Sequence, residues 1–482
     1  MSEKKLRLFV WLLFILIIAY VKVAHHELWK DEWQAWFVAK DKSISEVLSF
    51  LYYEGHPALW YLYLKIFTLF SGISNPEMLI NIAHWVIVAG GMFILFCRLR
   101  IPLIICIFGA LSYFLFFEYG IINRGYALMI LLSFWSAMLI SQRDYNSRQL
   151  AIILFLLCQT EVYGVFIAIS LGMWLLIGKD EIIKSLKSPA IFGLGLGLLF
   201  FVISVFPRTT GHVAKTRGKE LSFVDNILTS FQGNLSNTYL IGSTSDTFAY
   251  GWSVTGIVFS LLAFAGLIFI FYGQKKLLVP FLAFLVMMLT FSIFFFTGGI
   301  RQWGAGFVFL FVLLGLRGIE LQKDKIAGAI IVIFCIFGVI HNIKAVKEEI
   351  RLPFTNAEVT GRFIREKVPS KVPVVAINKF ETTPVIGYAG RKFYELPDGV
   401  EFSYFRWVDK VYLPTETERK LFAQFKGVGG IVIISPKPLD ADRFPSAKLW
   451  QKFDEENYKK ENYYLYSMAR RKNLHFHNTH NF

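Results

Sequence analysis

Long apolar runs separated by short polar connectors dominate the first two thirds of the chain. Runs that approach the roughly 20 residues needed to cross a bilayer recur between Leu8 and Ile343. They predict spans at residues 8–24, 78–97, 103–117, 126–140, 191–206, 252–272, 277–297, 306–319 and 326–343. Two further regions, 57–72 and 150–177, fit either full spans or helices that do not cross. The pattern predicts an α-helical polytopic membrane protein with about 11–13 transmembrane helices.

The pattern changes after Ile343. Between residues 344 and 482, the short β-like runs VPVVAIN and GIVIIS alternate with a polar helical stretch from Thr415 to Phe425. This alternation predicts a small soluble α/β domain at 344–482, after a membrane domain at 1–343. No glycine-rich phosphate motif opens a helix there, so nucleotide binding is not expected.

Composition agrees with a membrane protein. The 482 residues are 55% hydrophobic and 17% aromatic, and the mean hydropathy is +0.50. The net charge of +15 does not indicate nucleic acid, because Lys and Arg at loop ends act as topology signals in such chains. All four cysteines lie in apolar runs, so neither a disulfide framework nor a zinc site is indicated.

The basic connectors predict an orientation in the inner membrane. All of them can be cytoplasmic if 57–72 enters and returns on the outer side, and if 150–177 is two helices broken near Gln159-Thr160-Glu161. This gives about eleven spans, a cytoplasmic N-terminus and an extracytoplasmic C-terminal domain. In the alternative, where 57–72 crosses and 150–177 is one span, connectors containing Arg98 and Arg148 fall outside.

The favoured topology brings several polar segments to the outer face. They are the first external loop (22–56), Asn123-Arg124, Glu161-Val162-Tyr163, the loop 207–251, and Gly299-Ile300-Arg301-Gln302-Trp303. A pore would need polar residues along the full depth of several spans, whereas these span interiors are mostly apolar. The sequence therefore predicts a site at the bilayer boundary.

Ionisable residues in the first external loop are the first candidates for chemistry, because such groups are costly at a membrane unless they function there. Asp31 and Glu32 lie in WKDEWQAW, and Glu54 and His56 lie in YYEGHPALWYLY. Adjacent residues cannot both face outward on one helix, so Asp31 or Glu32 should point into the protein. Glu46 fits a solvated helix face instead.

These groups suit a sugar transfer from a lipid phosphate. That reaction needs a carboxylate base for the acceptor's proton and a cation for the departing phosphate. A basic cluster in the external loop 207–251 is a second candidate for holding an anionic lipid or acceptor, and a loop that orders only with substrate is the alternative. It consists of Arg208, His212, Lys215, Arg217 and Lys219.

The order of these features resembles the GT-C superfamily of membrane glycosyltransferases. The resemblance rests on the acidic pair Asp31-Glu32 after the first span and on His56-Pro57 opening the next helix. NRGYALMILLSFW and GIRQWGAGFVFL are similar to stretches of the branch that contains protein O-mannosyltransferases and aminoarabinose transferases. Many members have a second Pro after the HP pair, where this chain has Ala58, which indicates a distinct subfamily.

The resemblance implies an inverting transfer from a polyprenyl-phosphate sugar to an extracytoplasmic lipid, glycan or protein acceptor. Asp31 would be the base and Glu32 its neighbour. The expected substrate-binding residues are Glu54, His56, Arg124, Tyr163, Arg208 and Arg301, with Arg124 and Arg301 as the phosphate ligands. No cofactor is implied, although Asp31, Glu54, His56 and Glu161 have the ligand types for a divalent metal.

Two other classes remain open from the sequence. One is a flippase or transporter of lipid-linked sugars, which moves its substrate without forming a covalent product. The other is a polymerase or ligase of O-antigen type, whose large catalytic loops usually lie later in the chain than the acids found here.

Overall fold

The computed structural model describes residues 1–142, 146–177, 186–205, 222–240, 251–318, 320–396, 399–406, 417–425 and 428–469. Contacts divide the chain into two compact units. Unit 1 comprises Met1–His25 and Lys42–Ile350, and unit 2 comprises His26–Asp41 and Arg351–Phe482. Residues 26–41 therefore pack with the C-terminal region, although the sequence groups them with the membrane domain.

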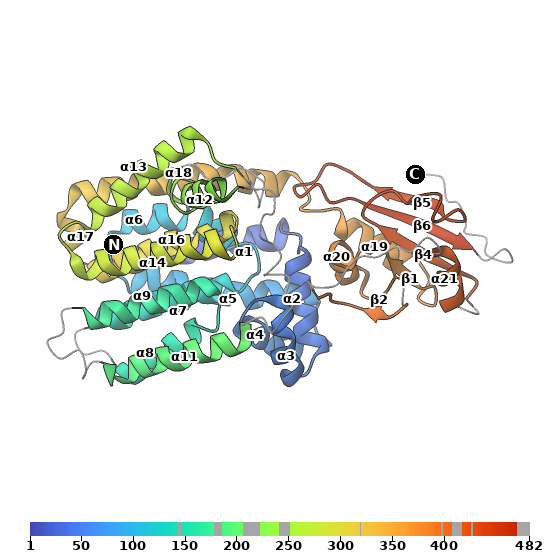
Figure 1. Ribbon diagram of the computed structural model, residues 1–482, viewed down its shortest axis with the longest axis horizontal. Helices are drawn as coiled ribbons and strands as arrows, with labels where there is room; N and C mark the ends of the chain where they lie inside the picture. The colour runs from blue at the N-terminus through green and yellow to red at the C-terminus, as the bar shows by residue number, and fades with distance from the viewer. Residues whose placement is uncertain are drawn as a thin grey trace. The chain divides into compact units, whose positions relative to one another are not determined.

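Unit 1 is a bundle of helices (Figure 1). Its longest are α1 (Glu3–Ala24), α5 (Pro76–Cys97), α13 (Val254–Phe271), α14 (Lys275–Phe294) and α18 (Lys325–Arg351). The shorter ones are α3 (Ile44–Glu54), α4 (Leu59–Thr68), α6 (Leu103–Ala110), α7 (Tyr126–Ile140), α8 (Ser147–Leu157), α9 (Val162–Leu176), α11 (Pro189–Val205), α12 (Phe223–Gln232), α15 (Ile300–Trp303), α16 (Ala305–Arg317) and α17 (Glu320–Lys323). Two π-helical turns, η1 (Phe114–Glu118) and η3 (Gly233–Asn237), interrupt the regular helices.

The helices confirm a polytopic membrane protein. In the described part of the chain, six segments are long and apolar enough to cross a membrane. They are Glu3–Ala24, Pro76–Cys97, Val254–Phe271, Lys275–Phe294, Ile300–Arg317 and Lys325–Arg351. The shorter apolar helices α7, α8, α9 and α11 coincide with other predicted spans or with the region 150–177. The total number of crossings and their orientation stay predictions.

The two ambiguous regions form short helices. Helix α4 has 10 residues and is therefore about 15 Å long at 1.5 Å per residue. That is about half of the hydrocarbon thickness of a bilayer. Between 147 and 176, helices α8 and α9 are separate and the chain turns at residues 158–161. The predicted break at Gln159-Thr160-Glu161 is confirmed.

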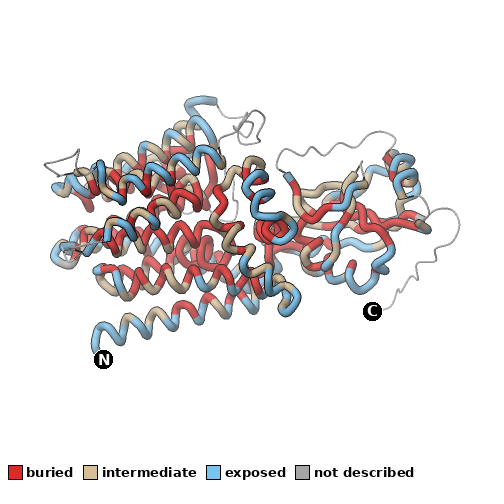
Figure 2. The backbone as a smooth tube through the Cα atoms, turned by 90° about the horizontal axis from the view of Figure 1, so that it is seen from below, coloured by how far each residue is buried: buried red, intermediate tan, exposed pale blue. Residues whose placement is uncertain are grey.

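The buried residues of unit 1 lie on the helix faces that point into the bundle. Figure 2 shows buried positions turned toward the inside of the bundle and exposed positions on its outer helix faces. Helix α16 is the most enclosed, since every residue from Ala305 to Gly315 is buried. Large apolar side chains such as Leu16, Phe192 and Val202 are exposed on other helices. An outer surface of this kind suits contact with lipid chains rather than water.

Unit 2 confirms the predicted α/β domain. Its strands are β1 (Val374–Ala376), β2 (Phe393–Glu395), β3 (Glu401–Phe402), β4 (Gly430–Ser435), β5 (Lys448–Phe453) and β6 (Tyr463–Ala469), and its helices are α2 (Lys30–Asp41), α19 (Ala357–Lys367), α20 (Lys379–Ala389) and α21 (Thr417–Gln424). The described strands form one sheet in the order β3-β2-β1-β4-β6-β5. β1 is parallel to β2 and β4, and the other neighbouring pairs are antiparallel. The runs VPVVAIN and GIVIIS became the adjacent strands β1 and β4.

Helix α2 packs on α20 within unit 2. The Trp33 indole contacts the ring of Tyr388 edge-on at 5.3 Å between centroids. A Cβ atom on Gly387 would lie 2.3 Å from the Trp33 ring. The backbone of α20 approaches the indole this closely only because residue 387 has no side chain.

Candidate active site

A histidine and a glutamate from distant parts of unit 1 form the centre of the candidate site. His56 lies between α3 and α4, directly after Gly55, whose left-handed conformation (φ 69°) ends α3. Glu161 precedes the first residue of α9, in the break after α8. His56 Nδ1 is 2.8 Å from Glu161 Oε2. The Glu161 side chain is 7% exposed and that of His56 is 33% exposed, so the imidazole is the more accessible partner.

The charge of Glu161 favours protonation of His56. Burial disfavours the imidazolium, but the negative charge of Glu161 and its hydrogen bond outweigh burial and raise the pKa of His56. The nearby positive charge of Arg124 acts in the opposite direction and Glu54 adds a smaller favourable contribution. The pair therefore favours a cationic imidazole whose Nε2–H can donate to an anion.

Glu54 and Arg124 surround the pair. Glu54 ends α3, is buried, and accepts a hydrogen bond from the Tyr61 hydroxyl at 3.0 Å. Arg124 is half-buried in the turn of residues 119–125 that joins η1 to α7. Its charge acts on both His56 and Tyr61. The structure thus brings Glu54, His56 and Arg124 into one electrostatic group, as the sequence predicted.

The backbone after Arg124 closes one side of this group. A Cβ atom on Gly125 would lie 3.1 Å from Glu161 Oε1 and 3.2 Å from Trp60 Cβ. The Leu59 amide donates to the Gln159 carbonyl at 3.2 Å, which ties the start of α4 to the break between α8 and α9. These contacts hold the three segments together, so the carboxylate of Glu161 has little room to move.

Tyr163 is buried behind the pair, two residues after Glu161 in α9. Its ring lies 6.3 Å from that of Tyr126, at an interplanar angle of 21°. Tyr126 in turn stacks on Tyr119 at 5.2 Å and 16°. The rings of Tyr119, Tyr126 and Tyr163 thus form a tyrosine column. Its predicted role in substrate binding stays a prediction.

Arg301 occupies a second polar centre of unit 1. Its Nε donates to Glu118 Oε1 at 2.5 Å, and both side chains are buried. The Tyr113 hydroxyl donates to the other oxygen of Glu118 at 2.8 Å, and the Tyr119 hydroxyl donates to the Arg301 carbonyl. The tyrosine column therefore joins this centre to Glu161. An ion pair is the observed role of Arg301, and its role as a phosphate ligand stays a prediction.

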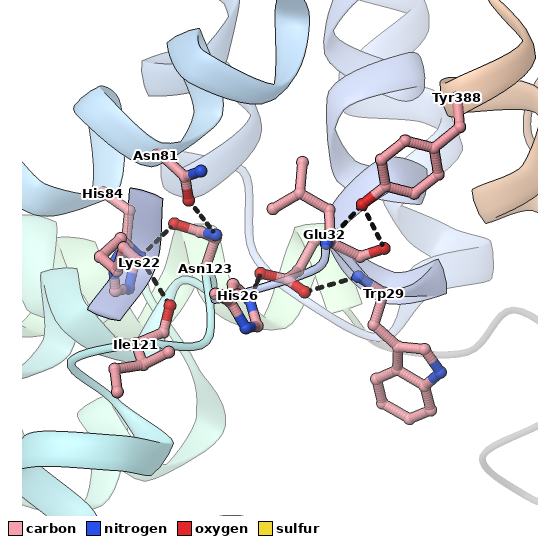
Figure 3. Close-up of polar contacts among 10 residues, drawn as sticks. Lys22, His26, Trp29, Glu32, Asn81, His84, Ile121, Asn123 and Tyr388 are labelled. Atoms are coloured by element: carbon pink, nitrogen blue, oxygen red, sulfur yellow. Dashed lines mark hydrogen bonds and ion pairs between the residues drawn. The ribbon is translucent and has the colours of Figure 1, made fainter. Parts of the chain in front are cut away.

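The acidic pair that opens α2 lies in unit 2. Glu32 Oε2 accepts from the Trp29 amide at 2.7 Å, and Oε1 is 3.0 Å from His26 Nε2, with both side chains fully buried (Figure 3). Asp31 is half-buried. Glu32 is thus the acid of the pair that points into the protein, in agreement with the expectation that at least one would. The carboxylate of Glu32 holds the start of α2, and the role of Asp31 as a base stays a prediction.

Two further predictions concern the basic cluster and a metal site. Arg208 and the rest of its basic cluster lie outside the described residues. Among the residues that the structure describes, no group of three or more His, Cys, Asp or Glu side chains is arranged to hold a metal ion.

Sequence reasoning named Glu161 only within a polar segment and as a possible metal ligand, and it missed Lys22 and His84. Both missed residues are ionisable groups inside predicted spans (8–24 and 78–97). Such residues usually mark functional positions, and that signal was available in the sequence.

The fold has a counterpart among solved structures. The crystal structure of ArnT from Cupriavidus metallidurans bound to undecaprenyl phosphate matches 95% of this chain and 97% of that chain with a TM-score of 0.53. The sequences are 9% identical, so the likeness concerns the fold. The predicted resemblance is therefore confirmed at the level of the fold alone. No family model and no curated protein matches the sequence.

Proposed function

We propose that this chain is an integral membrane glycosyltransferase. It transfers a sugar from a polyprenyl-phosphate donor to an acceptor outside the cytoplasm. The observation that carries the proposal is the fold, which follows ArnT over nearly the whole chain, including the C-terminal region. The polar group of Glu54, His56, Arg124 and Glu161 supports it, because these charges gather at helix ends of an otherwise apolar bundle.

The reaction assigns a role to each charge. The Asp31 carboxylate takes the proton of the acceptor hydroxyl, whose oxygen attacks the anomeric carbon from the face opposite to the phosphate. The bond between this carbon and the phosphate oxygen breaks, and polyprenyl phosphate leaves with the electron pair. Inversion at the anomeric carbon follows from this single displacement.

The leaving phosphate needs positive charge and hydrogen-bond donors. Arg124 supplies a guanidinium that can bind two phosphate oxygens, and cationic His56 supplies an Nε2–H. Glu161 favours the protonated form of His56, because its charge and hydrogen bond raise the pKa of the imidazole. Stabilising the charge that develops on the leaving group is commonly the largest contribution to such catalysis.

The test uses purified full-length protein in lipid nanodiscs with a polyprenyl-phosphate sugar and a candidate acceptor. We expect Asp31→Asn to retain the fold and donor binding but to lose transfer by about 10²–10⁴-fold, the usual contribution of a general base. Undiminished turnover in this variant would remove Asp31 as the base. Movement of the lipid-linked sugar across liposomes without a covalent product would instead indicate a transporter.

A further inference from the structure

A buried lysine in the first span contacts the turn that carries Arg124. Lys22 lies in the last turn of α1 and is 1% exposed. Its Nζ donates to the Ile121 carbonyl and to Asn123 Oδ1, both at 2.6 Å, and lies 3.2 Å from His84 Nδ1 (Figure 3). An ammonium group has three protons and only donates. Beside an ammonium group, His84 therefore accepts through Nδ1.

A second helix holds the same turn. Asn123 Nδ2 donates to Asn81 Oδ1 of α5 at 2.9 Å, so the Asn123 amide is bound from both α1 and α5. His84, which receives the third Lys22 contact, also belongs to α5 and is fully buried. Fully burying a lysine is rare and costly unless its partners are well placed. The location at the carboxyl end of α1 lowers that cost, because the helix dipole favours a cation there.

The other side of the turn faces the candidate active site. Arg124 follows Asn123 directly, and its charge acts on His56. The backbone of Gly125 rests against Glu161 and Trp60. The Trp60 ring also contacts the ring of His84 edge-on at 6.1 Å. The 119–125 turn is thus held between the Lys22 contacts and the residues around His56.

We propose that Lys22 is a positioning residue for substrate binding. Its ammonium group, together with Asn81 and His84, fixes the positions of Ile121 and Asn123. The turn then places the Arg124 guanidinium where it can bind the phosphate of the lipid donor. Lys22 acts through the turn and does not contact the substrate. The inference rests on the proposed function in one respect, the binding of a lipid phosphate by Arg124.

The proposal predicts that Lys22 and Arg124 act as one unit. The probe is polyprenyl phosphate without a sugar, titrated into the full-length protein in nanodiscs. We expect Arg124→Met and Lys22→Met each to weaken binding by about tenfold or more, and the double variant to bind no more weakly than Arg124→Met alone. In turnover, Lys22→Met should raise the KM for the donor more than it lowers kcat.

Two further variants separate positioning from general stability. Asn81→Leu removes the hydrogen bond from Asn123 Nδ2 to Asn81 Oδ1 but keeps the contact between Lys22 and Asn123. This variant is therefore expected to fold and to weaken binding less than Lys22→Met. Arg317→Met is the matched control. Arg317 is also a buried cation that donates to a backbone carbonyl, Ile270 at 3.0 Å, but it does so at the end of α16 away from Arg301. Its loss should lower thermal stability without changing the affinity for polyprenyl phosphate.

The possible failures are distinguishable. If the wild-type protein neither binds polyprenyl phosphate nor transfers sugar from it, the proposed function is wrong. If Arg124→Met weakens binding while Lys22→Met and Asn81→Leu bind like the wild type, the positioning role is wrong and the proposed function stands. Fully additive losses in the double variant would likewise contradict coupling between Lys22 and Arg124.

Discussion

His56 Nδ1 and Glu161 Oε2 lie 2.8 Å apart although 105 positions separate the two residues in the sequence. The pair joins the turn after α3 to the break between α8 and α9. A carboxylate bound to one imidazole nitrogen sets both the orientation of the ring and its charge.

The basic limb of the pH profile should depend on Glu161. Glu161 raises the pKa of His56, so His56 stays cationic to higher pH and loses its charge only as the pH rises through that raised pKa. In Glu161→Gln the favourable charge is gone while burial and Arg124 still oppose protonation. We expect kcat/KM for the donor to fall at a lower pH than in the wild-type enzyme.

The control for this pH shift is Glu46→Gln. Glu46 is exposed in the first turn of α3, and Gln can take its place in the helix cap. Its pH profile should match that of the wild type. A basic limb in Glu161→Gln that coincides with the wild-type curve would show that His56 does not act as a cation.

Gly125→Ala should reduce activity more than stability. The added Cβ would lie 3.1 Å from Glu161 Oε1 and 3.2 Å from Trp60 Cβ, so the Glu161 carboxylate and Trp60 must shift slightly, which disturbs the contact between Glu161 and His56. We expect a loss of about tenfold or more in kcat/KM, with a stability cost of about 1–3 kcal/mol for overpacking. Steady-state kinetics and thermal unfolding of the purified protein measure the two effects.

Gly328→Ala is the matched control for this substitution. Gly328 lies in α18, where a Cβ atom would meet nothing within 4 Å. Alanine should be neutral there, or stabilising by up to about 1 kcal/mol from helix propensity. Equal activity losses at positions 125 and 328 would contradict a specific effect on Glu161.

Arg301→Met should destabilise unit 1. The substitution leaves the buried carboxylate of Glu118 without its cation, at a cost of about 3–5 kcal/mol. The double variant Arg301→Met/Glu118→Gln should recover most of this loss, because the uncompensated charge is then absent. If Arg301→Met instead has the same thermal stability as the wild type but binds polyprenyl phosphate weakly, Arg301 acts as the phosphate ligand that the family resemblance implies.

Glu32 and Asp31 should separate into structural and catalytic roles. Glu32→Ala removes the acceptor of the Trp29 amide and the partner of His26, which should destabilise unit 2 by about 1–3 kcal/mol. Asp31→Asn should leave the thermal transition unchanged and lose transfer. The two variants are compared by thermal unfolding and by turnover, and an inactive but fully stable Glu32→Ala protein would reverse the assignment.

Local patterns were sufficient for much of the architecture. The apolar runs predicted helices such as α5 and α13, and polar residues inside the run 150–177 predicted the break before α9. Strands β1 and β4 were visible as β-branched runs. These features depend on neighbours within a few positions, where hydropathy and backbone preference act directly.

Local sequence patterns did not predict which polar and charged side chains contact each other. Lys22 and His84 lie among apolar residues and Glu161 lies at the break in an apolar run, and the partners described here for these three residues are far away in the sequence. Their partners come from other helices: His56 for Glu161, and the 119–125 turn for Lys22. Helix α2 shows the same limit, because its contact with α20 assigns it to unit 2 although it follows α1 directly.

By itself, the sequence determined that this chain is a polytopic membrane protein with a C-terminal α/β domain, and it identified most of the ionisable residues around the candidate site. Only the tertiary structure decided which of them meet: Glu161 with His56, Lys22 with Asn123, Glu118 with Arg301, and Glu32 with His26. The physical reason is that hydrophobic periodicity is a local property, whereas an ion pair or a hydrogen bond in an apolar interior requires two groups within about 3 Å. Such meetings depend on how helices pack, and packing is a property of the whole chain.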